Sequence, residues 1–379
     1  MSIYQNIGLK RVVNASGRVT KLGVSTISDK VAAAAVEGAS SYVVIDDLID
    51  RAGELIAEHT GAEGACVTSC ASAALALSIA GLVTRGQWTA VYKLPDPCGA
   101  ANEVVLQKGH SIDFGAPIQT MIRLGGGCPV ECGQANEVHP EDIEEAITDK
   151  TVCLLYVKSH HCVQKGMVDI ETMRDIAHAH NLPFVMDCAA EEDFRKYIAL
   201  GADIVCYSGA KALEATTSGF MCGKREYAEW AKRQYHGVGR AMKVGKEQIM
   251  GLLAALDQYE ARDHAAEVEV NVAKIDWLVS EINKIRGLHA EKIQDEAGRA
   301  IFRCRITFDS EAPVGLAMEQ VNEKLVSGDP IVWARTEFLN LGKIDFDPRP
   351  AIRSLSSKFS NRLWRAKLCR LTTTTTVFA

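Results

Sequence analysis

The sequence predicts an α/β protein, in which a mainly parallel sheet is sandwiched by helices and a smaller α+β domain follows. Three observations lead to this prediction. Apolar strand-like segments alternate with helical patterns from residue 64 to residue 211. Two of these segments lead to single polar side chains, Asp187 and Lys211. Beyond residue 257, amphipathic helical patterns give way to short alternating strands. Alternation of strand and helix favours a parallel sheet that helices cover on both faces.

Composition and charge exclude several classes of function. The 379 residues are 47% hydrophobic and 24% charged, as in a globular protein. A net charge of −6 argues against a dedicated nucleic-acid binder, because contact with phosphates needs a basic face. Residues 1–6 lack the basic and apolar regions of a signal peptide, and the longest apolar run, 71–83, is shorter than a membrane span. We therefore expect a cytoplasmic protein with no nucleic-acid or membrane partner.

The twelve cysteines are scattered along the chain, several of them inside apolar strands. Reduced cysteines in such places behave as small hydrophobic residues. Cys66 with Cys70, and Cys128 with Cys132, have four-residue offsets but no matching His or Cys pair at the spacing of a zinc site. We predict no metal site.

The first part of the chain, residues 1–45, is expected to form an N-terminal arm and one helix. Ser28 is the expected N-cap of this helix, and Gly38 its end. The large domain is assigned to residues 46–256. The patterns predict helices at 46–60, 71–83, 102–107, 141–147 and 170–180, and strands at 64–69, 90–94, 121–124, 153–157, 183–187 and 202–207.

The small domain is assigned to residues 257–350, after a helix at 248–259 that leads into it. Its patterns predict helices at 266–285 and 319–326, and strands at 303–309, 331–335 and 343–346. The tail, 351–379, has no clear periodicity, and we expect it to be poorly ordered.

Lys211 follows a buried strand and a turn of small residues. A desolvated ammonium loses basicity and can form a Schiff base, whereas the ordinary alternative is a surface lysine at the start of a loop. Asp187 ends another buried strand, where a turn or cap residue is the ordinary alternative. Ligands of doubly wound sheets bind outside the carboxyl ends of the strands, so both side chains should face one crevice. A carboxylate for the ring nitrogen and a lysine for the aldehyde are what pyridoxal phosphate requires.

A turn of small residues, Ser69, Cys70 and Ala71, opens the apolar helix at 71–83. Small residues let the backbone approach an anion, and a helix N-terminus offers N–H donors and a favourable dipole. The turn is therefore a candidate phosphate cradle, with Ser208 as a hydroxyl donor; the alternative is a capped core helix without a ligand. Glycines 125–127 lack the spacing of a dinucleotide site.

These residues lie within segments that resemble the selenocysteine synthase superfamily of fold-type I pyridoxal phosphate enzymes, and most of all its ammonia-lyases of amino-sugar acids. The resemblance extends over about residues 7–350, through the segments 13–18, 42–50, 67–73, 155–161, 208–211, 239–243 and 345–349. It implies the fold-type I architecture, pyridoxal 5'-phosphate as the cofactor, and a homodimer or higher homo-oligomer.

The resemblance also implies roles for individual residues. Lys211 and Asp187 would hold the cofactor, and the 69–71 turn with Ser208 would hold its phosphate. His160 or His110 would stack on the cofactor ring, and His161 would transfer protons. The alternative is that His160 and His161 are solvated or cap the chain. Further anion-binding candidates are Arg335 and Arg349, then Arg18, Arg240 and Lys243. For Arg335 and Arg349, a surface ion pair with Asp345 or Asp347 is the alternative. One departure stands out, because Ala215 and Thr216 replace the family's usual Gly-Pro.

The function that the resemblance implies is an ammonia-lyase. It would convert D-glucosaminate 6-phosphate, or a close amino-sugar acid, to 2-keto-3-deoxy-6-phosphogluconate and ammonia by α,β-elimination. One alternative is a selenocysteine synthase-like transferase on aminoacyl-tRNA, which predicts a basic surface and an extra N-terminal domain ahead of the motif at Asn14. Another is a catalytically inactive cofactor-binding protein, against which the presence of Lys211 and Asp187 argues.

Overall fold

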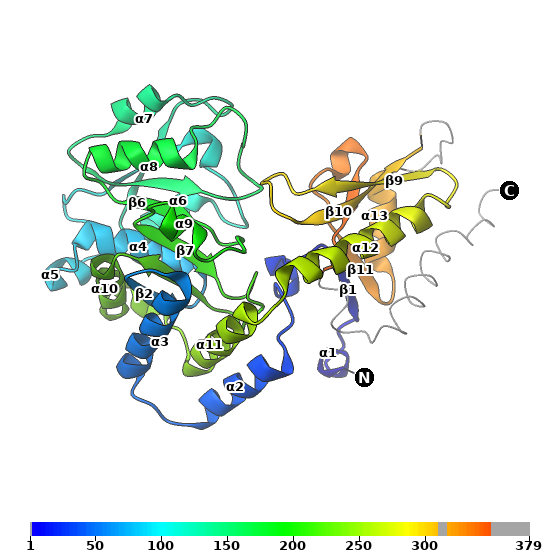
Figure 1. Cartoon of the computed structure of the whole chain (residues 1–379), viewed down its shortest axis with the longest axis horizontal. Coiled ribbons are helices and arrows are strands. Elements are labelled where there is room, and N and C mark those ends of the chain that lie inside the picture. Colours follow the sequence, from blue (N-terminus) through cyan, green and yellow to red (C-terminus); the bar gives the residue numbers. More distant parts are fainter. Residues whose placement is uncertain (1, 310–316, 350–379) are drawn as a thin grey trace. The chain divides into compact units, whose positions relative to one another are not determined.

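The computed structural model describes residues 2–309 and 317–349, and the described chain forms two compact units (Figure 1). The larger unit is Ile27–Arg262, and the smaller unit combines the residues up to Thr26 with those from Asp263 onward. The predicted boundaries differ in two ways. The expected N-terminal arm and helix, 1–45, divide between the units, and the large unit ends at 262 instead of 256. The predicted tail, 351–379, lies outside the described residues.

A seven-stranded sheet forms the centre of the larger unit. Its order is β2 (Gly64–Thr68), β8 (Gly219–Gly223), β7 (Ile204–Ser208), β6 (Phe184–Asp187), β5 (Thr151–Val157), β3 (Glu103–Gln107) and β4 (Cys128–Cys132). The five strands from β7 to β4 are parallel, whereas β8 runs antiparallel to both of its neighbours. Burial on both faces explains why the central strands β5, β6 and β7 read as nearly continuous apolar runs.

Helices cover both faces of this sheet. Successive side chains of each strand point to opposite faces, so both faces are apolar and both are buried under helices. In β7, for example, Val205 and Tyr207 pack into one core and Ile204 and Cys206 into the other. The first core is covered by α3 (Ile45–Thr60), α7 (Pro140–Ala146), α8 (Ile170–Ala179) and α11 (Lys246–Glu260), and the second by α4 (Ala71–Thr84), α6 (Ile118–Leu124) and α10 (Arg225–Arg233).

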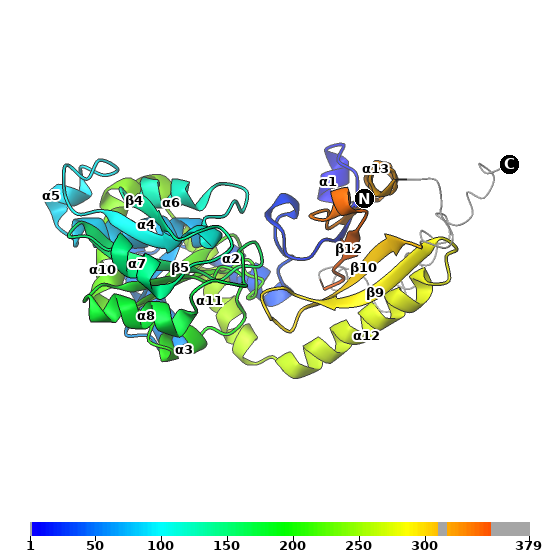
Figure 2. The same cartoon turned by 90° about the horizontal axis from the view of Figure 1, so that it is seen from above.

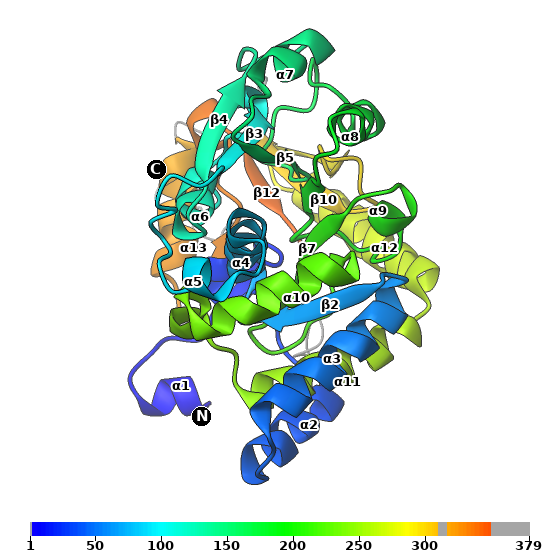
Figure 3. The same ribbon diagram turned by 90° about the vertical axis from the view of Figure 1, so that its left-hand side faces the viewer.

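Further helices complete the larger unit. Helix α2 (Asp29–Ser40) lies beside α11 (Figure 3), and α11 in turn contacts α3. The short elements are α5 (Trp88–Val91), α9 (Lys196–Ala199) and the 3-10 helices η2 (Lys108–His110), η3 (Gln234–His236) and η4 (Val238–Met242).

The smaller unit is built from two small sheets. A parallel pair joins β1 (Val12–Ala15) to β11 (Ile331–Ala334), and an antiparallel sheet has the order β12 (Ile344–Phe346), β10 (Phe302–Phe308), β9 (Leu288–Gln294). Helix α12 (His264–Ile282) packs along β9 and β10 (Figure 2), and α13 (Met318–Ser327) packs on β11. Two 3-10 helices, η1 (Thr20–Leu22) and η5 (Leu339–Leu341), and the terminal α1 (Ile3–Asn6) complete it. Pairing of β1 with β11 explains why the N-terminal residues belong to this unit.

Several short predictions were wrong in type. The segments predicted as strands at 90–94 and 121–124 lie at α5 and α6, and the helix predicted at 102–107 is β3. Strands β1, β4, β8 and β9 were not predicted. Apolar runs of four to six residues do not distinguish helix from strand by periodicity alone. Helix α2 also continues through Gly38, where a methyl group would lie 2.8 Å from Cγ of Met250. This glycine serves close packing with α11 and does not end the helix.

Within the described ranges, no helix has both the length and the hydropathy that a bilayer crossing requires. The same residues contain no cluster of three or more His, Cys, Asp or Glu side chains arranged to hold a metal ion. Their cysteines are all free thiols.

Candidate active site

Polar side chains gather at the carboxyl edge of the parallel strands. Asp187 is the last residue of β6, and Ser208 is the last residue of β7. The strand register pairs Ser208 with Gly219 of β8, and Gly219 in turn pairs with Thr68 at the end of β2. Lys211 follows β7 by three residues. The structure therefore brings the predicted Asp187, Ser208 and Lys211 to one edge of one sheet.

Asp187 and Lys211 interact electrostatically at this edge. Burial raises the pKa of the Asp187 carboxyl above its ordinary value, while the Lys211 ammonium and a hydrogen bond from the Ala189 N–H partly offset that rise. The Ala189 nitrogen lies 3.2 Å from Oδ1. A half-buried carboxylate in this position is stabilised by a cation, which is the property that a partner for a protonated pyridine nitrogen requires.

The loop that carries Lys211 is closed by its own backbone. The Gly209 N–H donates to the Ser218 carbonyl and the Ala215 N–H donates to the Gly209 carbonyl, both at 2.9 Å. Ala215 is buried, and the Thr216 hydroxyl donates to the Gln248 carbonyl of α11 at 3.1 Å. Ala215 and Thr216, which replace the expected Gly-Pro, thus anchor the loop by burial and a hydrogen bond.

The start of α4 is the predicted phosphate cradle. Side chains from Ala73 to Thr84 are buried, whereas Ser69, Cys70 and Ala71 are partly exposed. Cys70 caps the helix, because its Sγ accepts from the Ala73 N–H at 3.4 Å. The N–H groups in the first turn of a helix have no intrahelical acceptor, so this exposed turn presents donors to an anion.

Two features lie beside the start of α4. Ser208 is 9% exposed, and its hydroxyl makes no hydrogen bond to any residue that the structure describes. Gly219 brings β8 against the helix start, since a methyl group there would lie 2.4 Å from the carbonyl carbon of Cys70 and 2.6 Å from the amide nitrogen of Ala71. A hydroxyl without a protein partner on a largely buried residue is a position where a ligand oxygen is expected.

The three histidines differ in environment. His110 is buried, and its Nδ1 accepts a hydrogen bond from the Val157 N–H at 3.3 Å. Its ring packs edge-to-face with that of Tyr156, with the ring centroids 4.5 Å apart. Burial, with a smaller effect of Lys158, lowers the pKa of His110 to about 4, so its ring is neutral near pH 7. His160 and His161 follow β5, with ring centroids 4.0 Å apart, and His161 is exposed. The loop that bears them is joined to Asp187 by its Lys158 N–H, 2.9 Å from the Asp187 carbonyl.

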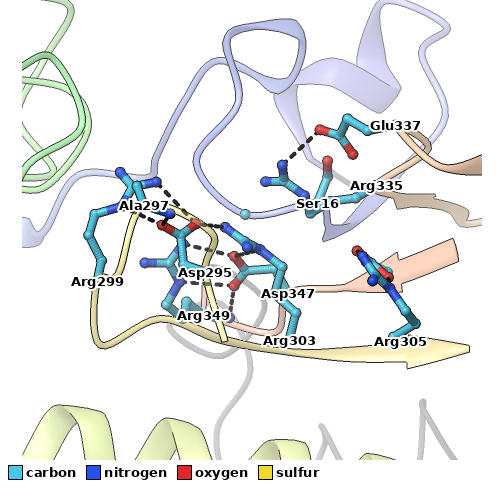
Figure 4. Close-up of polar contacts among 12 residues, drawn as sticks. Ser16, Asp295, Ala297, Arg299, Arg303, Arg305, Arg335, Glu337, Asp347 and Arg349 are labelled. Atoms are coloured by element: carbon cyan, nitrogen blue, oxygen red, sulfur yellow. Dashed lines mark hydrogen bonds and ion pairs between the residues drawn. The ribbon is translucent and has the colours of Figure 1, made fainter. Parts of the chain in front are cut away.

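The predicted substrate arginines belong to the smaller unit, where Arg349 binds the buried Asp347 and Arg335 binds Glu337 (Figure 4). Arg349 binds Asp347 with two parallel bonds, at 2.9 Å from Nε and 2.8 Å from Nη2. Arg335 is buried and donates from Nη2 to Glu337 at 2.8 Å. Arg18 follows Gly17, whose Cα packs so closely that a methyl group would lie 2.6 Å from Asp347 Oδ2.

Asp347 is fully buried. The Arg349–Asp347 ion pair is therefore internal, and not the surface ion pair that the sequence left as the alternative for Arg349. Burial by itself would raise the pKa of Asp347, but the guanidinium of Arg349, with Arg303 and Arg335, outweighs it and holds the pKa at about 2. Asp295 is likewise held ionised, with its pKa lowered by Arg299 and Arg303 against the effect of burial. The smaller unit thus concentrates guanidinium groups on internal carboxylates.

The residues at the sheet edge fit the cofactor that the resemblance implies. An amine and a carboxylate interact at one edge, the Ser208 hydroxyl lacks a protein partner among the described residues, and a partly exposed helix start presents amide donors beside it. Sequence reasoning missed Gly219, and it considered Asp347 only as a partner in a surface ion pair. Asp347 lies two residues from Arg349, which signals a local ion pair, but nothing in the sequence shows that it is buried.

Comparison with known proteins gives one family and several close relatives. The family model for SelA, L-seryl-tRNA selenium transferase, matches residues 12–315. The chain is 45% identical over 348 residues to the D-glucosaminate-6-phosphate ammonia lyase of Salmonella typhimurium (strain 14028s / SGSC 2262), across 92% of this chain and 93% of that protein. It is 39% identical over 348 residues to the 5'-C-glycyluridine monooxygenase-decarboxylase of Streptomyces sp, across 91% of this chain and 87% of that protein.

A solved structure confirms the fold. The chain matches a structure of D-glucosaminate-6-phosphate ammonia-lyase with a TM-score of 0.88 and 42% identity, over 98% of this chain and 99% of that one. The predicted fold-type I architecture, with a mainly parallel sheet between helices, is therefore correct.

Gly219→Ala tests the cradle. The added methyl group should push the start of α4 away from β8, and overpacking of this kind costs about 1–3 kcal/mol. We expect the affinity for pyridoxal phosphate to fall about tenfold, measured by fluorescence titration of the full-length protein. Gly53→Ala is the matched control, because its methyl group would lie 2.4 Å from the Ala65 carbonyl oxygen, at the other end of β2. Equal affinities in both variants and the wild type would show that Gly219 does not shape the cradle.

Asp347→Asn tests the arginine cluster. Removing one partner of a buried ion pair should lower the free energy of unfolding of the smaller unit by about 3–5 kcal/mol at pH 7. Because the folded-state pKa is depressed to about 2, the stabilisation from ionised Asp347 is present above its unfolded-state pKa and is lost as pH falls from about 4 to about 2. The difference in the free energy of unfolding between variant and wild type, measured by urea unfolding, should shrink by about 2 kcal/mol over that pH range. A difference that does not change with pH would contradict this assignment.

Proposed function

This chain belongs to the L-seryl-tRNA selenium transferase family, and we propose that within it the protein is a pyridoxal phosphate-dependent ammonia-lyase acting on an amino-sugar acid. The observation that carries the proposal is the interaction of Asp187 with Lys211 at the sheet edge, beside the Ser208 hydroxyl, which has no protein partner among the described residues. The similarity to the ammonia lyase of Salmonella typhimurium, over nearly the whole of both chains, supports the substrate class. The substrate we propose is D-glucosaminate 6-phosphate or a close analogue.

Each residue of the edge has a place in holding the cofactor. Lys211 would bind the aldehyde carbon, and Asp187 would keep a proton on the ring nitrogen. The amides of the 69–71 turn and the Ser208 hydroxyl would bind the phosphate, supported by the dipole of α4. His160 or His110 would pack against the ring. His110 is confined by Tyr156 and by the Val157 N–H, which favours the more exposed His160 for a role that requires access.

The chain's own residues would carry out the proton transfers. When bound, pyridoxal phosphate supplies an electron sink for the negative charge that forms at the substrate Cα. The Lys211 amine, released by the substrate amine, would take the Cα proton. Lys211 or His161 would then protonate the departing β-hydroxyl, which leaves as water. Uptake of one water later releases ammonia, so the substrate becomes 2-keto-3-deoxy-6-phosphogluconate and ammonia with no external oxidant.

Anionic groups of the substrate need cationic partners, and we propose arginine for this role. Arg335 and Arg349 are the candidates for the carboxylate and the distal phosphate, with Arg18 as a further one. Arg349 already binds Asp347 through its fork, which limits the donors it can offer. Arg335 donates from Nη2 to Glu337 at 2.8 Å, and we propose it beside Arg349 for the same role.

We further propose that the protein works in the cytoplasm as a homodimer or higher homo-oligomer. The support lies in a run of exposed apolar side chains before α3, where Tyr42 is fully exposed and Val43 and Val44 are 46% and 62% exposed. Contiguous exposed apolar residues of this kind mark interaction surfaces. A small-molecule substrate fits this proposal, and the net charge of −6 argues against a nucleic-acid substrate.

Three other functions make different predictions. A transferase on aminoacyl-tRNA would bind tRNA with a steep dependence on salt. A monooxygenase-decarboxylase, the activity named for the Streptomyces relative, would consume oxygen and release carbon dioxide. A catalytically inactive protein would bind the cofactor, or nothing, without turnover.

Ammonia release from phosphorylated and free amino-sugar acids separates these functions. We expect the wild type to release ammonia and a 2-keto acid in equal amounts, without oxygen uptake. Lys211→Ala should lose the aldimine absorbance band and at least about 10³-fold of the activity, since a base and an anchor are removed together. Lys224→Ala, which removes the partner of Asp203 at the other end of β7, is the control and should retain both. Undiminished activity in Lys211→Ala would defeat the proposed function.

A further inference from the structure

A buried ion pair lies three residues beyond Lys211. Nη2 of Arg262 is 3.2 Å from Oε2 of Glu214, and the two side chains are only 9% and 14% exposed. Moving a charge from water into a protein interior costs several kcal/mol, and a buried pair recovers this only in good geometry. Such a pair is therefore weak as a source of stability, and its position beside the lysine calls for another explanation.

The backbone at Glu214 supports this view. Its φ is +57°, in the left-handed region that a non-glycine residue occupies at a cost of about 1 kcal/mol. The flanking Leu213 and Ala215 are buried, and the Glu214 N–H donates to the Lys211 carbonyl at 3.2 Å. The turn from Lys211 to Glu214 is therefore short and closed. The backbone of Glu214 is thus hydrogen-bonded directly to the backbone of Lys211.

Arg262 reaches two further segments of the site. Its guanidinium lies over the Tyr259 ring at 5.6 Å, and the Tyr259 hydroxyl donates to the Glu192 carbonyl at 2.5 Å. Glu192 belongs to the loop that follows Asp187. Nε of Arg262 is buried and has no hydrogen-bond partner in the described part of the chain, and its Nη2 contact with Oε2 of Glu214 is an ion pair without hydrogen-bond geometry. One arginine thus contacts the lysine loop and, through a tyrosine, the loop after the aspartate.

Arg262 is also the last residue of the larger unit. Helix α11 ends at Glu260, and the next residue along the chain, Asp263, belongs to the smaller unit and caps α12 by accepting from the Ala266 N–H at 3.0 Å. The segment where the chain passes from one unit to the other is therefore attached to the lysine loop by a charge pair.

We infer that Glu214 and Arg262 are positioning residues for Lys211, which hold the lysine loop and the loop after Asp187 at fixed places relative to the end of α11. This inference rests on the proposed role of Lys211. It assigns a function to an ion pair that neither touches the phosphate cradle nor supplies a proton. Loss of the Glu214 charge releases the Lys211 turn, and the exposure and reactivity of the Lys211 amine change with it.

The test measures the Lys211 amine itself. Full-length protein freed of cofactor is treated with sulfosuccinimidyl acetate, and peptide mass spectrometry gives an acetylation rate for each lysine. In Glu214→Gln, we expect the rate at Lys211 to change about fivefold or more, while other lysines stay within about twofold of the wild type. Glu214→Asp, which keeps the charge on a side chain shorter by one methylene, should give an intermediate rate.

Asp203→Asn is the matched control. Asp203 is a buried carboxylate of the same unit, 2.7 Å from Lys224, at the opposite end of β7 from Lys211. Both Glu214→Gln and Asp203→Asn should lower the melting temperature, but only the former should change the rate at Lys211. If the Glu214–Arg262 pair only stabilised the fold, the acetylation rate at Lys211 would be the same in the two variants and the wild type. This result would overturn the inference.

A second variant covers the case in which Glu214→Gln does not fold. Arg262→Lys keeps the positive charge but loses the planar fork and its stacking on Tyr259. An unchanged rate at Lys211 in folded Arg262→Lys would also overturn the inference. Failure of the proposed function has a separate signature, since it would leave the wild type without an aldimine band whatever the acetylation rates are.

Discussion

The central constraint in this structure is the electrostatic interaction between a half-buried carboxylate, Asp187, and the amine of Lys211. Each group by itself would be costly at the end of a buried strand, because the charged form loses its hydration. Placed together, they reduce that cost and leave a site that favours a ring with a cationic end and an aldehyde. The parallel order of β6 and β7 is what brings them to the same edge. Antiparallel neighbours would have placed them at opposite edges.

The rest of the larger unit can be understood as support for that edge. Gly219 lets β8 approach the start of α4, so that amide donors lie beside Ser208. Burial of the lysine loop against α11 fixes its course, and the Glu214–Arg262 pair continues this attachment to the end of α11. The smaller unit follows a different principle. There, guanidinium groups gather on internal carboxylates, and Asp347 remains ionised because of them. A cluster of this kind holds arginine side chains in fixed orientations, which is how selective recognition of carboxylate or phosphate is achieved.

Much of this arrangement could be predicted from the sequence. Long amphipathic helices, continuous apolar strands such as β5 and β7, and polar residues at strand ends give clear local patterns. Asp187 and Lys211 were identified this way, and the resemblance to a known family added the cofactor. Short elements were less predictable, because β3 has apolar residues in an order that fits helix and strand equally. The pairing of β1 with β11 joins residues more than three hundred positions apart, and no local pattern shows it. Burial of Asp347 and the left-handed φ of Glu214 likewise depend on tertiary contacts.

Identification of the lysine that bonds to the cofactor tests the central claim most directly. Cofactor-loaded protein is reduced with sodium borohydride, digested, and examined by mass spectrometry for the added pyridoxyl group. The structure predicts that the group is found on the peptide that contains Lys211. A pyridoxyl group on another lysine of the same sheet edge, such as Lys158, or no labelled peptide at all, would contradict the account.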